Sequence, residues 1–428
     1  MLCGAVGMYA SPGETCRTGC GEMKFKILRA GLFILAMGTG SVRPQEAPRL
    51  TLQSALDLAE KQNLDLAAAR RRRAVALAGV QIARQRPNPS ISFEALRDSP
   101  HEALLFDQPL ELGFKRGRRI EVARQEGALT EVEIAALARQ VRRNTREAFY
   151  RSLLARAETE RLTRVVQLAE RLGRISRERF EAGAVPQLEV IQAGLEVSRA
   201  QADFQVAQQR EKVYLSQLNA LLNEPASTRW ELAGSLEDAK PLPSLPELIE
   251  RASQSNPELQ RLGQEQKVEE SRRGLLKAER IPNLGLQFGT DLNSPPDFRA
   301  GPRGQLSLEL PLFMRNQGQI AQSLAYQQVL AAERAATARA VAARVEAGYF
   351  DLEAQRTQVE LYRDKLLPLA RQVESMAEES YRSGKTSILA VLQAQQNVQE
   401  VERSYWESLF ALQSNYASLE ETVGGPVE

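Results

Sequence analysis

Cysteine and histidine are almost absent from this chain of 428 residues. The three cysteines, Cys3, Cys16 and Cys20, all precede the apolar run 30–37, and His101 is the single histidine. A chain cleaved after that run has no disulfide, no thiol nucleophile and no thiolate metal site. One histidine alone cannot form a metal-selective site. Because no nucleophile and base occur together in a recognisable motif either, we predict that the protein is not an enzyme and holds no cofactor.

Net charge and long apolar runs are also lacking. Lys and Arg number 56 against 54 Asp and Glu. No basic field therefore attracts nucleic acid, and the run Arg70–Arg73 is interpreted as a solvated helix face. After residue 41 no apolar stretch approaches the roughly 18 residues of a membrane-spanning helix, so any entry into a membrane does not use helices. Aromatic residues are only 6% of the chain, and the abundant Ala, Leu, Gln, Glu and Arg favour long helices.

The N-terminal segment is typical of an exported precursor. Basic residues precede the apolar run 30–37, and the small residues 38–41 follow it. This order predicts a signal peptide, and we assign residues 1–41 as an N-terminal extension and signal peptide. Whether translation starts at Met1 or Met23 stays open. No cysteine follows the apolar run, so we expect no N-terminal lipid anchor.

An internal repeat spans most of the chain. Residues 179–194 and 380–395, aligned on Gly183 and Gly384, both contain an aromatic residue, two further residues, glycine, a short turn and an amphipathic run. Four further landmarks recur in the same order: Ala55–Asn63 with Leu248–Asn256, Pro87–Phe93 with Pro282–Phe288, Phe106–Leu110 with Leu308–Leu312, and Gly117–Ile120 with Gly318–Ile320. The repeat predicts two equivalent halves, a first structural repeat at 50–222 and a second at 245–423, joined by a linker at 223–244.

Each half is expected to contain two shorter helices, two strands and a pair of very long helices. The expected ranges are helices 51–61 and 64–86, strands 90–96 and 103–112, and helices 118–180 and 187–222 in the first half, and strands 284–288 and 305–310 and helices 318–382 and 387–422 in the second. Thr51 or Asn63 is expected to cap a helix, and Pro368 to kink one. The stretch 293–304 is expected to lack regular structure, and the tail 424–426 to be disordered.

Helical hairpins of this length must pack side by side as coiled coils. One apolar stripe marks each returning helix, at Val197, Ala200, Phe204, Leu215 and Leu218 in the first half and at Val398, Val401, Tyr405, Tyr416 and Leu419 in the second. Four alternating strands cannot close a membrane barrel alone, because an open sheet leaves backbone groups unpaired in lipid. We therefore expect strands from several chains to close a barrel that the helices continue as a tube. The predicted activity is passage rather than bond chemistry.

These landmarks resemble the TolC-like outer membrane factors of Gram-negative bacteria over about 50–424. The resemblance implies a mainly α fold with a small β part, in which long antiparallel helical hairpins form an α-barrel tunnel in the periplasm. It also implies four transmembrane strands per chain that complete a homotrimeric twelve-stranded barrel in outer membrane lipid. Partners would be a periplasmic adaptor and an inner membrane pump.

The strand exit Gln108–Arg119 resembles the CzcC-like branch of that family, which serves heavy-metal pumps of the resistance-nodulation-division (RND) type. Phe114 departs from that branch, which usually has a second glycine there. Heavy-metal cation efflux is therefore the predicted function. Multidrug efflux and type I secretion are alternatives, and a periplasmic adaptor is a further one.

Two sets of site residues follow from the resemblance. The turns at Gly183 and Ala184 and at Gly384 and Lys385 are the expected periplasmic tips that dock the adaptor. The alternative is that these glycines only end helices.

The second set is a pore constriction. Its candidates are Glu189, Gln192 and Gln393, of which only Glu189 is charged. A ring of three Glu189 carboxylates would favour cations in the pore. The alternative is a solvated charge that stabilises a helix N-terminus.

Overall fold

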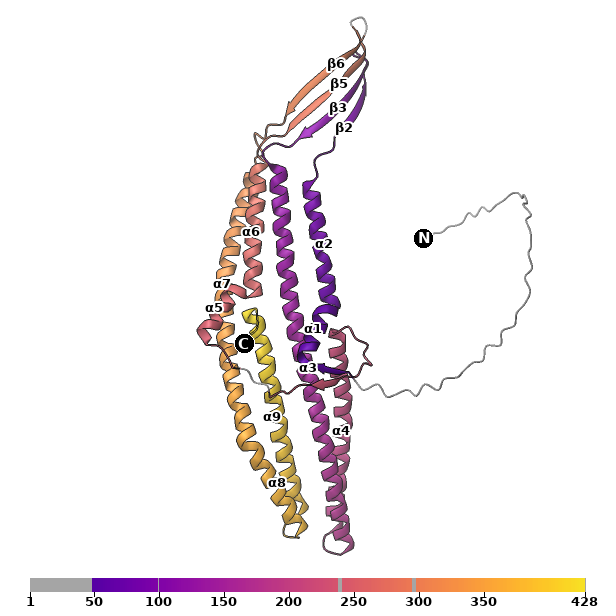
Figure 1. Cartoon of the computed structure of the whole chain (residues 1–428), viewed down its shortest axis with the longest axis vertical. Coiled ribbons are helices and arrows are strands. Elements are labelled where there is room, and N and C mark those ends of the chain that lie inside the picture. Colours follow the sequence, from indigo (N-terminus) through magenta and orange to yellow (C-terminus); the bar gives the residue numbers. More distant parts are fainter. Residues whose placement is uncertain (1–47, 99, 238–240, 295–297, 428) are drawn as a thin grey trace, which may run out of the picture. The chain divides into compact units, whose positions relative to one another are not determined.

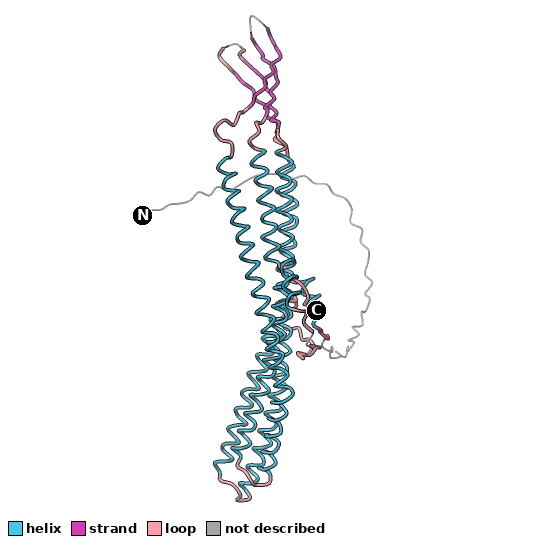
Figure 2. The backbone as a smooth tube through the Cα atoms, turned by 90° about the vertical axis from the view of Figure 1, so that its left-hand side faces the viewer, coloured by secondary structure: helices cyan, strands magenta, loops and turns pink. Residues whose placement is uncertain are grey.

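The computed structural model describes residues 48–98, 100–237, 241–294 and 298–427, which all belong to one unit. The signal peptide predicted at 1–41 lies outside the described residues. The second half repeats the helix and strand order of the first. The four-stranded sheet lies at one end of the long helices and the hairpin turns at the other (Figures 1 and 2). The mainly α architecture with a small β part is confirmed.

The elements of the first half run from β1 to α4. They are β1 (Arg49–Thr51), α1 (Leu52–Gln62), α2 (Leu64–Arg84), β2 (Ser90–Ala95), β3 (Glu102–Leu110), α3 (Lys115–Glu181) and α4 (Gln187–Leu221). Helix α3 has 67 residues, which corresponds to roughly 100 Å at 1.5 Å per residue. No proline interrupts it, and its many Ala, Leu, Arg and Glu residues are strong helix formers.

The linker carries one short strand, and the second half then repeats the order of the first. The elements are β4 (Glu231–Ala233), α5 (Leu245–Ser255), α6 (Pro257–Ala278), β5 (Leu284–Ser294), β6 (Phe298–Leu308), α7 (Gln317–Leu361), a π-helical turn (Tyr362–Leu366), α8 (Leu367–Arg382) and α9 (Ile388–Val423). The π-turn stands where a kink was expected. Pro368 cannot donate to the carbonyl four residues before it, and Leu367 donates instead to the carbonyl of Tyr362, five residues back.

Equivalent asparagines begin the second helix of each half. The Asn63 side chain accepts from the Leu66 amide, and the Asn256 side chain accepts from the amides of Glu258 and Leu259. The side-chain nitrogen of each asparagine also donates to the end of the returning helix of its own half. Asn63 Nδ2 donates to the Leu221 carbonyl at 3.1 Å, and Asn256 Nδ2 donates to the Thr422 carbonyl at 2.7 Å. Thr51 caps α1 through a capping box with Ser54. Both expected caps are present.

The strands form two sheets. Strands β1 and β4 pair in parallel, a contact of the linker with the start of the chain that the sequence did not reveal. The larger sheet is antiparallel in the order β2-β3-β5-β6, so each half supplies one hairpin and the halves join at β3 and β5. Among the described residues, β2 and β6 each pair with a strand on one side only.

Two expectations for flexible segments are wrong. The stretch 293–304 is largely strand, because β5 extends to Ser294 and β6 begins at Phe298. Pro302 pairs with Thr290 in β6, an edge strand of the chain's sheet, where proline is tolerated. The C-terminal tail is ordered as far as Val427, which is 2% exposed in the core.

Gly424 explains the ordered tail. Its φ of +88° ends α9, and the amides of Gly424 and Gly425 both donate to the Glu420 carbonyl. This conformation turns the chain back, so that Val427 reaches the main core.

The core lies where the two halves meet, halfway along the long helices. It includes Phe149, Leu218, Leu352, Leu409 and Tyr416. Of the predicted stripes, that of α9 is buried at Val398, Tyr405, Tyr416 and Leu419, whereas α4 buries mainly Ala193, Ala200, Ala207 and Leu218. Alanines let α4 lie close to α3 along the hairpin. None of the helices in the described ranges is both long and apolar enough to cross a membrane.

Candidate functional site

The larger sheet separates apolar from polar side chains. The register places on one face Ile91, Phe93, Leu104, Phe106, Leu286, Phe288, Leu306 and Leu308. The other face carries Ser92, Glu94, Asp107, Gln287, Asp291, Arg303 and Gln305, together with the buried Ala103 and Leu105. Ile91 is 73% and Leu306 69% exposed. A continuous apolar face this exposed requires an apolar environment.

The sheet curls toward its polar face. Arg303 of β6 lies 3.5 Å from the Asp291 carboxylate of β5 and 3.8 Å from the Glu94 carboxylate of β2. Because β3 and β5 separate β2 from β6, the ion pair with Glu94 forms only if the polar face is concave. The apolar face is therefore convex, as in the wall of a barrel with a wet interior.

Both hairpin tips have the same geometry. Gly183 and Gly384 have φ values of +71° and +73°, and in each the amide of the following residue donates to the carbonyl five positions earlier. These distances are 2.8 Å from Ala184 to Arg179 and 2.9 Å from Lys385 to Ser380. The pattern is a Schellman motif, which favours glycine at the left-handed position. All four predicted docking residues are exposed at these turns.

The three constriction candidates differ in exposure. Gln192 on α4 and Gln393 on α9 are exposed in the single chain. Glu189 is only 9% exposed and lies 3.9 Å from Arg179 on the same hairpin. The Glu189 carboxylate is thus neutralised inside the bundle.

Arg179 connects the two tips. Its Nη1 atom donates to the Tyr381 carbonyl at 3.2 Å, and its guanidinium carbon lies 4.7 Å from the centre of the Tyr381 ring. Tyr381 is fully buried against Leu172, Ile388 and Val391. Burial raises the pKa of the Tyr381 hydroxyl, and the charge of the nearby Glu189 carboxylate raises it further. Arg179 and the buried Tyr381 ring therefore join the two hairpins at their tips, and the Arg171–Glu378 ion pair at 3.5 Å adds a second contact between them.

Sequence reasoning missed this cluster and the ion pairs of Arg303. Arg179 and Tyr381 are 202 positions apart, and surface arginines are frequent in this chain. The only signal was that both residues adjoin the repeated turns. Arg303 lay in the stretch that was expected to lack regular structure.

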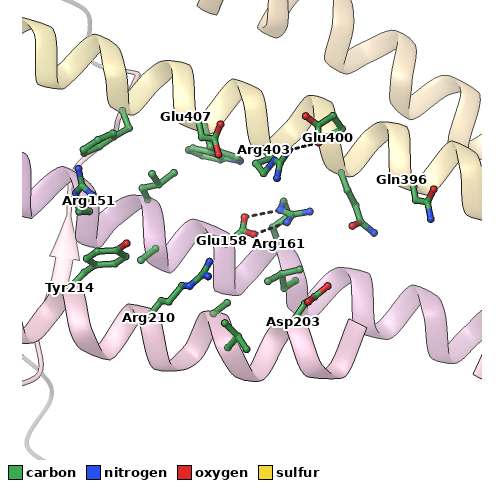
Figure 3. A pocket seen from close by; sticks show the side chains of 18 residues that line it. Arg151, Glu158, Arg161, Asp203, Arg210, Tyr214, Gln396, Glu400, Arg403 and Glu407 are labelled. Carbon is green, nitrogen blue, oxygen red and sulfur yellow. Dashed lines mark hydrogen bonds and ion pairs between the residues drawn. The ribbon is translucent and has the colours of Figure 1, made fainter. Parts of the chain in front are cut away.

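A cavity lies farther along the bundle, between α3, α4 and α9 (Figure 3). Its volume is about 700 Å³. Arg161 pairs there with Glu158 and Arg403 with Glu400, and Arg151 lies over the Phe410 ring at 4.8 Å. Half of the charged residues that line this cavity are therefore paired with one another. The described residues contain no group of three or more His, Cys, Asp or Glu side chains placed to hold a metal ion.

The family model for outer membrane efflux proteins matches residues 55–224 and 248–425. The chain belongs to the outer membrane efflux protein family. It is similar to the cobalt-zinc-cadmium resistance protein CzcC of Cupriavidus metallidurans, with 26% identity over 83% of this chain and 86% of the relative.

Solved channels share the fold of this family member. The CusC structure matches with a TM-score of 0.73 at 16% identity, over 87% of this chain and 92% of CusC. The outer membrane protein VceC of Vibrio cholerae matches with a TM-score of 0.70 at 16% identity, over 88% of this chain and 97% of VceC.

Family membership assigns the role and place of the described parts. The protein is an outer membrane efflux channel, and its helical tunnel lies in the periplasm. The predictions of fold, location and of a duct rather than an enzyme are confirmed.

Proposed function

We propose that this channel is the outer membrane duct of a tripartite system that exports heavy-metal cations. The proposed cargo rests on one observation, the similarity to the cobalt-zinc-cadmium resistance protein CzcC over most of both chains. An RND-type inner membrane pump would deliver the cations through a periplasmic adaptor. The described residues offer no metal cluster, which suits a duct that lets cations pass and leaves their selection to the pump.

The cargo is tested by deletion and complementation. Cells that lack this protein should lose resistance to zinc, cobalt or cadmium, and the wild-type gene should restore it. Resistance to hydrophobic drugs and export of peptides are measured in parallel. Loss of drug resistance with unchanged metal resistance would contradict the metal cargo and favour the multidrug alternative.

We further propose a homotrimer in which the strands of three chains close one barrel. The convex apolar face and the free sides of β2 and β6 support it, because unpaired strand edges are costly in lipid. A heat-modifiable trimer band in outer membrane fractions tests this arrangement. A stable monomer that still conducts ions in bilayers would rule it out.

Docking of the adaptor is assigned to the tips with Gly183, Ala184, Gly384 and Lys385. Bulky residues at either glycine would disturb the turn itself, because both have positive φ. Ala184→Trp and Lys385→Glu change only the exposed surface. We expect both to abolish export while trimers persist.

A control separates docking from general damage. Ala202→Trp makes the same change at an exposed position of α4, 18 residues and roughly 27 Å from the tip. Export should persist in this variant. Full export by the Ala184 and Lys385 variants would argue against docking at the tips.

We assign the narrow end of the pore to Gln192 and Gln393. Glu189 contributes indirectly, because its ion pair with Arg179 helps to hold the hairpin tip in place. Three copies of each exposed amide would form polar rings without fixed charge. Gln393→Asp should raise the preference of single channels for cations, because it adds three carboxylates. If Gln192→Asp and Gln393→Asp both leave conductance and ion preference unchanged, the constriction lies elsewhere.

A further inference from the structure

A cleft opens between the end of α6 and the segment that follows β6. Its volume is about 450 Å³. The lining residues are Lys277, Arg280, Ile281, Leu310, Pro311, Leu312 and Arg315. Three of them are cations, four are apolar, and none is a carboxylate. A ligand that fits this lining carries a negative charge beside an apolar part.

The cleft continues the membrane-facing surface. Leu306 and Leu308 lie on the apolar face of β6, and Leu310 and Leu312 continue the same two-residue spacing below the strand. All four are at least half exposed. Because the helices of this channel lie in the periplasm, this end of the strands meets the periplasmic side of the outer membrane. The cleft is therefore level with lipid headgroups.

The cations of the cleft lack carboxylate partners. Lys277, Arg280 and Arg315 form no ion pair with any side chain in the described part of the chain. The adjacent Glu279 carboxylate instead accepts from the Asn316 side chain at 3.1 Å. Arg315 is held in place by its Nε atom, which donates to the Pro311 and Leu312 carbonyls. Three cations thus face the lipid boundary uncompensated.

The first half differs from the second at two matched positions. Counting back from Pro87 and Pro282, Ile82 occupies the position of Lys277 and Gln85 that of Arg280, while Arg84 and Arg86 lie at neighbouring positions. Ile82 is 65% exposed. The duplicated fold itself does not require cations at these two positions, so Lys277 and Arg280 are available to a ligand.

We propose that this cleft binds the phosphate group of an anionic phospholipid of the periplasmic leaflet, with the acyl chains lying on the face of Leu306 and Leu308. A basic residue close to an anionic lipid surface contributes about a fivefold factor in affinity. Three such residues together would contribute roughly a hundredfold. The four apolar residues favour a lipid over a free phosphate, because they shield its glycerol and first methylenes from water.

The test measures lipid binding to the purified, delipidated trimer. Short-chain phosphatidylglycerol, short-chain phosphatidylcholine and glycerol phosphate are titrated separately, and bound molecules are counted by native mass spectrometry. Wild type should prefer phosphatidylglycerol over both other probes. The triple variant Lys277→Gln, Arg280→Gln, Arg315→Gln should lose about a hundredfold in affinity for it while its binding of phosphatidylcholine stays unchanged.

A matched variant removes three other exposed cations, Arg71, Arg72 and Arg339, by substitution with glutamine. It should bind phosphatidylglycerol like wild type. If the triple cleft variant does not assemble, Arg280→Gln alone should still lose about fivefold, and 0.5 M salt should weaken binding to wild type.

Three results would overturn the proposal. Equal binding of phosphatidylcholine and phosphatidylglycerol would remove the role of charge, and equal binding of glycerol phosphate would leave only a simple anion site. An equal loss in the matched variant would show that any surface charge suffices. None of these outcomes bears on the metal cargo, which is measured independently.

Discussion

Removing the Arg179 side chain should loosen the contact between the two hairpin tips. Arg179 supplies a charged hydrogen bond to the Tyr381 carbonyl, a cation–π contact with the Tyr381 ring and an ion pair with Glu189. The side chains of Arg179 and Glu189 are 22% and 11% exposed, so water screens the pair only partly. Arg179→Ala would also leave the Glu189 carboxylate buried without a paired cation.

The magnitude follows from these contacts. A charged hydrogen bond contributes about 1.5–3 kcal/mol and a partly exposed cation–π contact about 0.5–1 kcal/mol. The 3.9 Å separation of the ion pair is long, and we assign it little additional energy. Loss of all three contacts should lower the free energy of local opening by about 2–4 kcal/mol. The opened population of the tips should then rise by roughly 30- to 800-fold.

Hydrogen exchange on the assembled trimer measures this opening. Peptides that cover 172–193 and 377–392 should exchange faster in Arg179→Ala by that factor, with the core around Phe149 unchanged. Arg177→Ala is the control, because Arg177 is exposed on the same helix and forms no ion pair among the described residues. It should change opening by less than about 0.5 kcal/mol.

A double-mutant cycle with Glu189→Gln decides whether the pair acts as a unit. Glu189→Gln alone should cost about 1 kcal/mol, because Arg179 keeps its two contacts with Tyr381. In the double variant no charge is stranded, so the combined loss should be smaller than the sum by at least about 0.5 kcal/mol. Additive effects, or unchanged exchange in Arg179→Ala, would refute the reasoning.

Three further predictions test other parts of the fold. Gly424→Ala should destabilise the protein by several kcal/mol and lower its Tm, because φ is +88° and a Cβ would lie 2.0 Å from the Ser255 carbonyl oxygen. The control Gly425→Ala should be neutral, because a Cβ there meets nothing within 4 Å. Equal Tm values for the two variants would contradict this prediction. Gly289→Ala should reduce the yield of assembled trimers, because its Cβ would lie 2.1 Å from the Leu104 carbonyl oxygen. The control Gly304→Ala should keep the wild-type yield, because a Cβ there meets open space. Equal trimer yields for the two variants would count against the register of β3 and β5. Burial raises the pKa of Tyr405 and of Tyr416. Their neutral forms stabilise the fold below about pH 10, and this stabilisation is lost as the pH rises further. Tyr405→Phe should therefore flatten the loss of helical circular dichroism between about pH 10 and 12, and an unchanged slope would disprove this.

Helix lengths were predictable because the signals are local. The expected helix 118–180 is Lys115–Glu181, and the returning helices are Gln187–Leu221 and Ile388–Val423. A run of good helix formers without proline must be helical, and a glycine with positive φ ends it wherever the hairpin turns.

Other features depended on distant partners. The stretch 293–304 contains prolines and glycines that favour a loop, yet the residues from Phe298 onward are strand, because they pair with β5. The tail 424–426 looked flexible because nothing in its own sequence shows the core that receives Val427. In each case long-range packing overrode a local preference.

The sequence by itself determined the duplication, the hairpins with their glycine turns and the alternation of the strands, because these depend on residues close together along the chain. Only the tertiary structure decided which face of the sheet is convex and that Arg179 joins the two tips. It also decided that Glu189 is neutralised inside the bundle and that Lys277, Arg280 and Arg315 gather around one cleft. These features bring together side chains from separate elements, and no local pattern records the distance between such elements.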